Sequence, residues 1–318
     1  METVFSLAKA PRYPSPVATI GVFDGVHRGH LKVLSETVRW ASEIDGTALV
    51  ITFDRHPERV LAGASPDSIT SLEHKLHLIA RTDIDVCVVL HFDREMAEMQ
   101  PERFVREVLV ESLAVTGAVL GFNARFGRDA AGDEQLLRLM GRRHGFEVRT
   151  VGPLLIDGEP VSSTRIRSHI EAGELDAAAR LLGRPFALRG TVVHGAKRGA
   201  GLGFPTANLN LHHEATPPRG VYICRVSTDG GVYWGLVNIG MRPTFEEGEA
   251  APTKHVEVYL DDYAGGPLYG ETLEVEPVKF LREETCFASP EALAVQLEED
   301  RRTLRTFRST IADESKSA

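Results

Sequence analysis

The stretch VATIGVFDGVHRGHLKVL, residues 17–34, decides the fold of the first half of this 318-residue chain. Its opening segment, Val17–Phe23, is apolar and rich in β-branched residues, which predicts a buried β-strand. The sequence DGVHRGH follows, and apolar residues then recur at helical spacing at Leu31, Leu34, Val38 and Ala41. The stretch therefore predicts a strand, a short glycine-containing loop and a helix in direct succession.

Strand and helix patterns keep alternating from this stretch to about Val151. Strands are predicted at 48–53, 86–90, 118–122 and 146–151, with helical patterns between them. Such alternation favours an α/β fold, in which a doubly wound parallel sheet carries helices on both faces.

The pattern changes after about residue 183. Segments become short, β-rich and separated by turns, and the sequence DGG at 229–231 is a hairpin signal. Strands without intervening helices favour an antiparallel β-barrel. A last helix is expected to begin near Pro290 and to run to about Phe307, before a disordered tail. We predict two domains, residues 1–184 and 185–318.

Charge and cysteine content narrow the class of protein. The net charge of −9 and the pI of about 5.8 disfavour a nucleic-acid partner, which generally needs a basic face. Cys87, Cys224 and Cys286 are widely separated, which disfavours a disulfide scaffold and fits a reducing cytoplasm. With no long apolar run and no secretory signal pattern, we expect no membrane partner. The sequence is compatible with a homo-oligomer.

The loop at 21–30 has the features of an anion site. Gly21, Gly25 and Gly29 permit close approach of the backbone to a ligand. A helix N-terminus at the carboxyl end of a parallel strand attracts phosphates. His27 and His30 are three residues apart, so both imidazoles can donate to one phosphate and stabilise the charge that develops as pyrophosphate leaves. The plain alternative is a strand–turn–helix with surface histidines.

A second predicted helix start carries hydroxyl and cationic side chains. In VSSTRIRSHI, residues 161–170, a hydroxyl of Ser162, Ser163 or Thr164 can cap the helix. The free N–H groups of this helix, together with Arg165 and Arg167, make an anion site. Without the two arginines, the hydroxyl residues are more simply explained as helix caps.

Glycines and cations gather again in GAKRGAGLGFPTANL, residues 195–209. The glycines permit a loop that wraps phosphates through backbone N–H groups, although the GxxxxGK[ST] order of a P-loop is absent. Thr206 and Asn208 offer hard oxygen ligands suited to a Mg²⁺ ion that bridges nucleotide phosphates. A glycine-rich β-turn is the alternative. The residues singled out here are Gly195, Lys197, Gly201, Gly203, Pro205, Thr206 and Asn208.

Together these motifs resemble those of the bacterial bifunctional riboflavin kinase/FAD synthetases, in the family's order along nearly the whole chain. GVFDGVHRGH resembles the HxGH motif of nucleotidyltransferases, SSTRIR resembles the family's SSTxIR motif, and GLGFPTAN resembles its kinase motif. GFNARFGRDAAG, residues 121–132, resembles a strand-end loop, and LEHKL, residues 72–76, resembles a helix without an assigned role. The chain departs from the family pattern at Val22, Ala124 and Ala130.

The resemblance implies a role for each matching residue. Catalysis of adenylylation falls to His27 and His30, and binding of ATP or FMN falls to Gly21, Phe23, Asp24, Gly29, Asn123, Ser162, Ser163, Thr164, Arg165 and Arg167. In the kinase, Glu257 of the strand HVEVYL is the implied base for the ribityl 5′-hydroxyl. The glycine-rich loop and Asn238 then contact ATP or the flavin, and Arg282 either contacts the ligand or packs.

The implied activity has two steps, both with ATP as co-substrate and Mg²⁺ as the metal. The first phosphorylates riboflavin to FMN, and the second transfers AMP to FMN, which gives FAD and pyrophosphate. Two other classes compete with this interpretation. One is another nucleotidyltransferase, such as a cytidylyltransferase, a pantetheine-phosphate adenylyltransferase or a class I aminoacyl-tRNA synthetase, none of which has a place for the PTAN module. The other is a non-catalytic flavin-binding protein, which ATP turnover would rule out.

Overall fold

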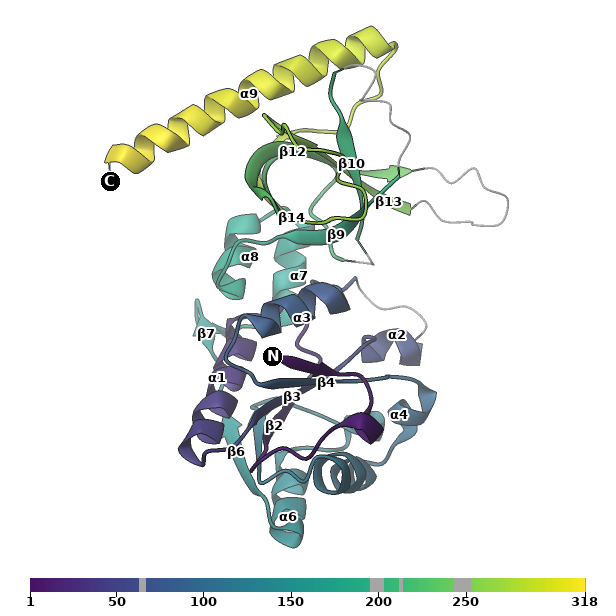
Figure 1. Ribbon diagram of the computed structural model, residues 1–318, viewed down its shortest axis with the longest axis vertical. Helices are drawn as coiled ribbons and strands as arrows, with labels where there is room; N and C mark the ends of the chain where they lie inside the picture. Colours follow the sequence, from purple (N-terminus) through teal and green to yellow (C-terminus); the bar gives the residue numbers. More distant parts are fainter. Residues whose placement is uncertain (63–66, 195–202, 212–213, 243–252, 318) are drawn as a thin grey trace. The chain divides into compact units, whose positions relative to one another are not determined.

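The chain folds into two compact units, shown in a computed structural model (Figure 1). The first unit comprises Met1–Ile166 and Leu181–Gly183, and the second comprises Arg167–Arg180 and Arg184–Ala318. The structure describes residues 1–62, 67–194, 203–211, 214–242 and 253–317. The predicted phosphate-loop residues Gly195, Lys197 and Gly201 lie outside these ranges.

The first unit is built on a six-stranded sheet in the order β1-β4-β3-β2-β5-β6. Every neighbouring pair of strands in this sheet is parallel. The strands are β1 (Glu2–Val4), β2 (Val17–Ile20), β3 (Ala48–Phe53), β4 (Val86–Leu90), β5 (Gly117–Gly121) and β6 (Glu147–Val151). The predicted doubly wound parallel sheet is confirmed. The edge strand β1 was not predicted, because three residues are too few to show a pattern.

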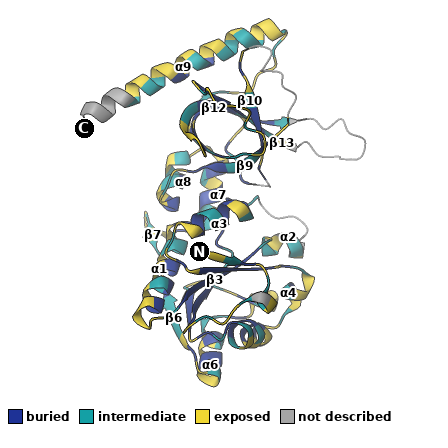
Figure 2. Cartoon of the chain, viewed as in Figure 1, coloured by how far each residue is buried: buried dark blue, intermediate teal, exposed yellow. Residues whose placement is uncertain are grey.

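Helices cover both faces of this sheet, and alternate strand residues enter two separate apolar cores. Ala18, Leu49 and Ile51 belong to one core, and their sequence neighbours Val17 and Val50 belong to the other. Figure 2 shows the central strands as buried. The helices of this unit are α1 (Arg28–Glu43), α2 (Pro57–Ala62), α3 (Leu72–Ala80), α4 (Arg94–Glu98), α5 (Pro101–Phe104), a π-helical stretch over Val105–Ser112, and α6 (Glu134–His144).

The strand order reverses at β2. Strands β3 and β4 follow on one side of β2, whereas β5 and β6 follow on the other. In a doubly wound sheet the loops after the two strands at this reversal diverge and leave a crevice, where ligands bind. The fold therefore places the loops that follow β2 and β5 at the point where a ligand is expected.

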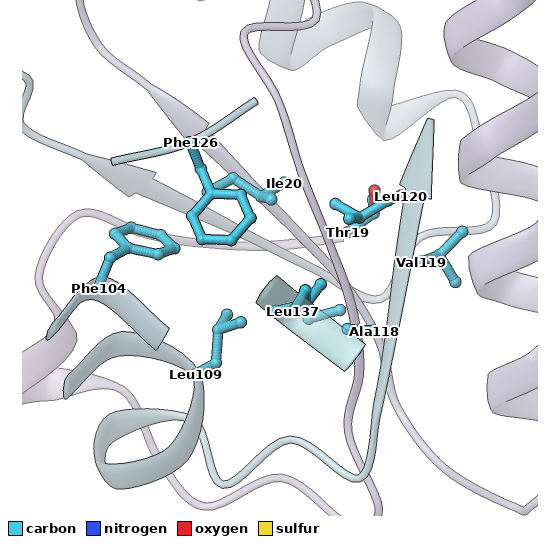
Figure 3. A pocket seen from close by; sticks show the side chains of 10 residues that line it. Thr19, Ile20, Phe104, Leu109, Ala118, Val119, Leu120, Phe126 and Leu137 are labelled. Atoms are coloured by element: carbon cyan, nitrogen blue, oxygen red, sulfur yellow. The ribbon is translucent and has the colours of Figure 1, made fainter. Parts of the chain in front are cut away.

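The core beneath this point is closely packed. A small cavity of about 10 Å³ lies among residues of β2, β5 and the adjoining helices, with Phe104, Phe126 and Leu137 in its wall (Figure 3). Thr19 supplies the one hydroxyl among the lining side chains, and its Oγ1 has no hydrogen-bond partner within the described part of the chain. A buried water needs two to four polar partners, so this cavity is a packing gap and not a ligand site.

The second unit contains a closed antiparallel barrel in the order β10-β13-β12-β11-β14-β9, which confirms the predicted barrel. Its interior is filled by residues such as Val237, Val258 and Val275, which are fully buried. The strands are β9 (Leu188–Val193), β10 (Thr206–Asn210), β11 (Gly220–Thr228), β12 (Gly231–Arg242), β13 (Thr253–Leu260) and β14 (Thr272–Arg282). Helices α7 (Ser163–Glu171) and α8 (Leu175–Leu182) link the two domains in sequence.

The terminal helix α9 (Pro290–Ser317) packs on the outside of this barrel. Leu304 is fully buried there in a cluster with Ile223 and Leu236. The helix continues past the predicted end near Phe307, where the sequence predicts a disordered tail. Residues 308–317 contain neither proline nor glycine, so nothing in their sequence ends the helix early. Among the described residues, no helix is both long enough and apolar enough to cross a membrane.

Trp40 of α1 packs directly against the backbone of β5. A Cβ on Gly117 would lie 2.6 Å from the Trp40 ring, too close for an undisturbed contact. We expect Gly117→Ala to lower the free energy of unfolding by ~1–3 kcal/mol, because the ring has to move within a packed core. Urea unfolding followed by circular dichroism measures this. Gly152→Ala is the matched control, because its Cβ meets no atom within 4 Å. Equal losses in the two variants would contradict the packing argument.

Candidate functional site

His27 begins helix α1 and serves as its N-cap. The His27 Nδ1 accepts a hydrogen bond from the backbone N–H of His30 at 3.2 Å. A neutral imidazole with an accepting Nδ1 carries its proton on Nε2. The cap therefore fixes His27 in the form whose Nε2–H is a donor. Gly29 makes this arrangement possible, because a Cβ there would lie 3.1 Å from the His27 ring.

His30 stacks on His27, with ring centroids 3.5 Å apart and planes inclined by 15°. The Phe23 ring meets His30 edge-on at 5.2 Å. Burial lowers the pKa of His30 well below its ordinary value, and electrostatic interactions with His27 and Lys75 lower it further. The Nδ1 of His30 is buried and has no partner among the described residues, which leaves it available to a ligand. The structure thus brings both predicted histidines together.

The loop between β2 and α1 is held in a strained conformation. Phe23 and Val26 have positive φ angles of 53° and 39°, which are costly for residues with a Cβ, above all for a β-branched one. The Asp24 carboxylate accepts hydrogen bonds from the backbone N–H groups of Ile69 at 2.8 Å and Thr70 at 3.2 Å. Asp24 was predicted to bind ligand, and the structure places this carboxylate on the backbone of the neighbouring loop.

The predicted helix start at 162–167 reaches the same loop. The Ser163 hydroxyl donates to the carbonyl of Asp24 at 2.9 Å, and the Ser162 hydroxyl accepts from the Arg165 N–H as the cap of α7. The Arg165 guanidinium donates to the carbonyl of Ile156 at 3.0 Å, so it fixes the hairpin formed by β7 (Leu155–Ile156) and β8 (Glu159–Pro160). Thr164 is exposed. Arg167, further along α7, belongs to the second unit.

Asn123 lies in the loop that follows β5, the strand next to β2. It is exposed, and the loop around it is closed by a bridge between Phe126 and Gly132. Because the carboxyl ends of parallel neighbours lie at one edge of a sheet, this loop shares an edge with the histidine loop. Ala130, where the chain departs from the family pattern, has a φ of +55°.

Sequence reasoning missed Lys75 as a site residue. Its ammonium is buried and donates to the carbonyls of Val22 at 3.1 Å and Phe53 at 2.9 Å. A usable signal was present, because Lys75 stands on the same helical stripe as the apolar residues Leu72 and Ile79. A lysine on the stripe of a helix that faces the core is rare unless its charge is paired.

In the barrel, the predicted kinase residues fall on one row of cross-strand partners. Asn208 of β10 pairs with Glu257 of β13, which pairs with Asn238 of β12. Asn238 pairs in turn with Val221, which pairs with Arg282 of β14. Side chains of directly opposite residues lie on the same face of a sheet. Asn208 and Glu257 are 49 positions apart in the chain, Glu257 and Asn238 are 19 apart, and Asn238 and Arg282 are 44 apart, so sequence alone could not have aligned them in this way.

Hydrogen bonds organise this row. The Glu257 carboxylate pairs with His255 Nε2 at 2.9 Å, and the Asn238 amide donates to Glu284 at 3.4 Å. The Oδ1 of Asn238 is buried without a partner in the described part of the chain, so it can accept from a ligand hydroxyl or N–H. Thr206 lies two residues before Asn208 on β10, and its side chain therefore shares this face. Neither His255 nor Glu284 was singled out from the sequence.

Arg282 is fixed by the terminal helix. Its guanidinium donates to both carboxylate oxygens of Asp300 on α9, with a shortest distance of 2.8 Å. In a second contact the barrel supplies the carboxylate and α9 supplies the cations. The buried Asp261 after β13 accepts from Arg305 and Arg308 of α9. These two reciprocal ion pairs attach α9 to the barrel beside the row of kinase residues.

The burial of His30 predicts a pH-dependent stability. Its folded pKa is below the ordinary 6.5, so as the pH falls below 6.5 the unfolded chain binds a proton that the folded chain does not. The free energy of unfolding therefore decreases, by up to about 1.4 kcal/mol per pH unit from this group. We expect His30→Gln to lose less stability than the unmodified protein between pH 7 and pH 5 in urea titrations. Parallel curves would contradict this.

The Arg282–Asp300 pair predicts a large mutational cost. Asp300→Ala leaves the guanidinium beside a buried surface without its counter-ion, which costs ~3 kcal/mol or more. Urea unfolding monitored at Trp234 reports on this region, because Trp234 packs against Phe307 of α9. The control is Glu299→Ala, an exposed carboxylate one residue earlier, which we expect to change stability little. Equal losses of stability in the two variants would contradict a special role of the Arg282–Asp300 pair.

Comparison with known proteins identifies a family for each half of the chain. A family model described as FAD synthetase matches residues 10–165, and one described as riboflavin kinase matches residues 182–308. The chain is similar to the bifunctional riboflavin kinase/FMN adenylyltransferases of Pseudomonas fluorescens, with 37% identity over 91% of this chain and 92% of the relative, and of Escherichia coli K12, with 35% identity over 96% of each.

A solved structure shares the fold of most of the chain. It is the crystal structure of a macrolide-efflux protein from Streptococcus pneumoniae, with a TM-score of 0.78 and 28% identity over 95% of this chain and 98% of that one. Two family models match the chain in succession, and the relatives named above exceed 30% identity over nine tenths of its length. The chain thus belongs to the family of bifunctional riboflavin kinase/FMN adenylyltransferases.

Proposed function

We propose that this chain makes FAD from riboflavin in two ATP-dependent steps at two separate sites. The second unit phosphorylates riboflavin to FMN, and the first adenylylates FMN to FAD and releases pyrophosphate. The observation that carries this proposal is the stacked pair His27 and His30 at the strand-order reversal, together with the row Asn208–Glu257–Asn238 on the barrel. The domains that we assign to these activities are residues 1–184 and 185–318.

Adenylyl transfer needs donors where negative charge develops. A phosphate oxygen of FMN attacks the α-phosphorus of ATP, and the bond from that phosphorus to the bridging oxygen of pyrophosphate breaks. The Nε2–H of His27 and the ring of His30 are placed beside the N-terminus of α1, which itself favours anions. Because these donors are pre-positioned by the cap and the stack, they stabilise the transition state without reorganisation.

Other predicted residues position the reactants at this edge. We assign the N–H groups at the start of α7, beside Ser162, Ser163 and Thr164, to the polyphosphate. Arg167 adds charge from the same helix. Asn123 is assigned to a polar contact with FMN or ATP, since it is exposed at the end of the neighbouring strand. For Asp24 and Arg165 we assign positioning of the loop and of the hairpin, because their side chains already bind backbone groups there.

Phosphorylation of riboflavin needs a base near the ribityl 5′-hydroxyl. Glu257 is half-buried on the row of kinase residues, with His255 holding one of its oxygens at 2.9 Å. We assign Glu257 to accept the hydroxyl proton as this oxygen attacks the γ-phosphorus, with ADP as the leaving group. Asn238 and Arg282 flank this position, and we assign them to the flavin or the nucleotide. Gly203 and Pro205 lead into β10 from the glycine-rich loop.

Magnesium is part of the proposal for both steps. The described residues hold no group of three or more His, Cys, Asp or Glu side chains placed to bind a metal. Mg²⁺ commonly takes one or two protein oxygens and completes its octahedron with water and phosphate oxygens. Thr206 and Asn208 fit this pattern, because both project from one face of β10 beside Glu257. When bound, Mg²⁺ neutralises phosphate charge.

The remaining proposals concern partners and location. We propose riboflavin, FMN and ATP as the partners, with neither nucleic acid nor membrane, in keeping with the net charge of −9. The three cysteines are all free thiols, which supports a reducing cytoplasm as the location.

The two sites predict separable activities. We expect His27→Ala with His30→Ala to abolish conversion of FMN to FAD, because the pre-positioned donors are lost, and to leave FMN formation intact. Glu257→Ala is expected to abolish FMN formation and to spare adenylylation of supplied FMN. Chromatography of flavins during incubation with riboflavin, ATP and Mg²⁺ measures both steps.

The activity that each variant keeps serves as its folding control. Undiminished FAD formation by the histidine variant would refute the catalytic assignment. If the unmodified protein binds flavin without turning over ATP, the chain is a flavin-binding protein and not an enzyme. If it turns over ATP with neither riboflavin nor FMN as acceptor, it is a nucleotidyltransferase of another kind.

A further inference from the structure

Lys75 stands at the carboxyl ends of two central strands. It lies on α3, and its ammonium donates to the carbonyl of Val22, just beyond β2, and to that of Phe53, the last residue of β3. The carboxyl edge of a doubly wound sheet is where ligands bind. One ammonium therefore covers two acceptors at the edge that carries the histidine loop.

The hydrogen bonds of this ammonium do not by themselves require a charged group. Burial lowers the pKa of Lys75 to about 8, although Asp24, Cys87 and Asp54 oppose the shift. Both of its hydrogen-bond acceptors within the described residues are backbone carbonyls. The carbonyl of Val22 also accepts from the Thr52 hydroxyl, so it does not depend on Lys75 alone. A neutral side chain would avoid the cost of burying a charge, and a purely structural tie does not require one.

The charge acts on the reacting edge. Uncovered carbonyls at the ends of β2 and β3 would repel a polyphosphate, whereas an ammonium between them presents positive charge. The same charge lowers the pKa of His30, after the larger effect of burial and together with the electrostatic interaction with His27. His30 is thereby kept as a neutral imidazole beside His27, which is itself fixed by its cap.

We propose that Lys75 is a positioning residue of adenylyl transfer, which ties the histidine loop to β3 and makes the carboxyl edge of the sheet receptive to the phosphates of a nucleoside triphosphate. This inference rests on the proposed function of the first unit and deepens it. Lys75 acts through Val22, Phe53 and His30, so its removal affects binding of ATP and the protonation of His30 and not the kinase step. It also gives a function to the sequence LEHKL, which the motif analysis left without one.

The test replaces Lys75 by Met, which retains much of its volume and removes the charge. We expect kcat/KM for ATP in FAD formation to fall on the order of 10- to 100-fold, because the edge is no longer pre-positioned. The acid limb of the pH–rate profile and the NMR titration of the His30 ring are expected to move to higher pH. Riboflavin phosphorylation by the same molecules serves as the internal control and is expected to be unchanged.

Lys32→Met is the matched control. Lys32 is an exposed lysine of the same unit that also donates to a backbone carbonyl, that of Gly152 at 3.0 Å. We expect this variant to keep the wild-type adenylylation rate and pH profile. Lys75→Gln tests the hydrogen bonds separately, since it is neutral and still carries N–H donors. If the charge is responsible, Lys75→Gln lowers kcat/KM for ATP in FAD formation as much as Lys75→Met does.

Each outcome decides the proposal. If wild-type protein forms no FAD, the proposed function of the first unit fails before Lys75 is tested. If wild-type protein forms FAD and Lys75→Met retains its rate and pH profile, the positioning role is refuted. If both Lys75 variants lose hydrogen-exchange protection in β2 and β3, Lys75 only holds the fold, which also refutes the proposal. Loss of adenylylation with protected strands and a displaced His30 titration supports it.

Discussion

The first unit depends on satisfying the backbone of one loop where the sheet ends. The Gly21 N–H, just beyond β2, still donates to the Ile51 carbonyl of β3. Further along the loop, side chains from distant segments supply hydrogen-bond partners. Thr52 and Lys75 donate to the Val22 carbonyl, Asp24 binds the amides of the 69–70 segment, Thr70 accepts from the Gly25 N–H, and Ser163 donates to the Asp24 carbonyl. This network holds Phe23 and Val26 at positive φ, a conformation that local sequence alone would not keep. The same network fixes the positions of the stacked histidines.

The two sites that we propose for phosphate chemistry differ in construction. In the first unit, a parallel sheet gathers loop ends and helix N-termini at one edge, so the donors are largely backbone N–H groups and imidazoles. In the second, an antiparallel barrel aligns side chains from three strands on one row, so the site is made of carboxylate, amide and hydroxyl groups. The first arrangement suits stabilisation of a developing anion, and the second suits removal of a proton from an alcohol. Terminal helix α9 contributes to the second site by fixing Arg282 through Asp300.

Local sequence patterns predicted where helices and strands lie better than they predicted which segments and side chains contact one another. The segments around 17–23, 48–53 and 86–90 are continuous apolar runs, and such runs report burial in a parallel sheet directly. The edge strand Glu2–Val4 escaped notice, because it is short and gains its structure only by pairing with β4. The motifs assigned Asp24 and Arg165 to ligand binding, whereas the structure shows their side chains binding backbone groups. Lys75 lies in the matched segment LEHKL but received no role, because a single charge on an apolar helical stripe carries less weight than a loop motif.

The sequence by itself determined the order of the elements, the change from an α/β to a β-rich half, and the motifs to which we assign phosphate chemistry. These follow from periodicity and residue type, which act over a few neighbouring positions. Only the tertiary structure decided that β2 is flanked by β3 and β5, that His27 caps its own helix with a defined donor nitrogen, and that Asn208, Glu257 and Asn238 share one row. The reason is physical: strand order, register and burial are set by contacts between segments far apart in the chain, and no local pattern encodes which partner a strand, a carboxylate or a buried ammonium will find.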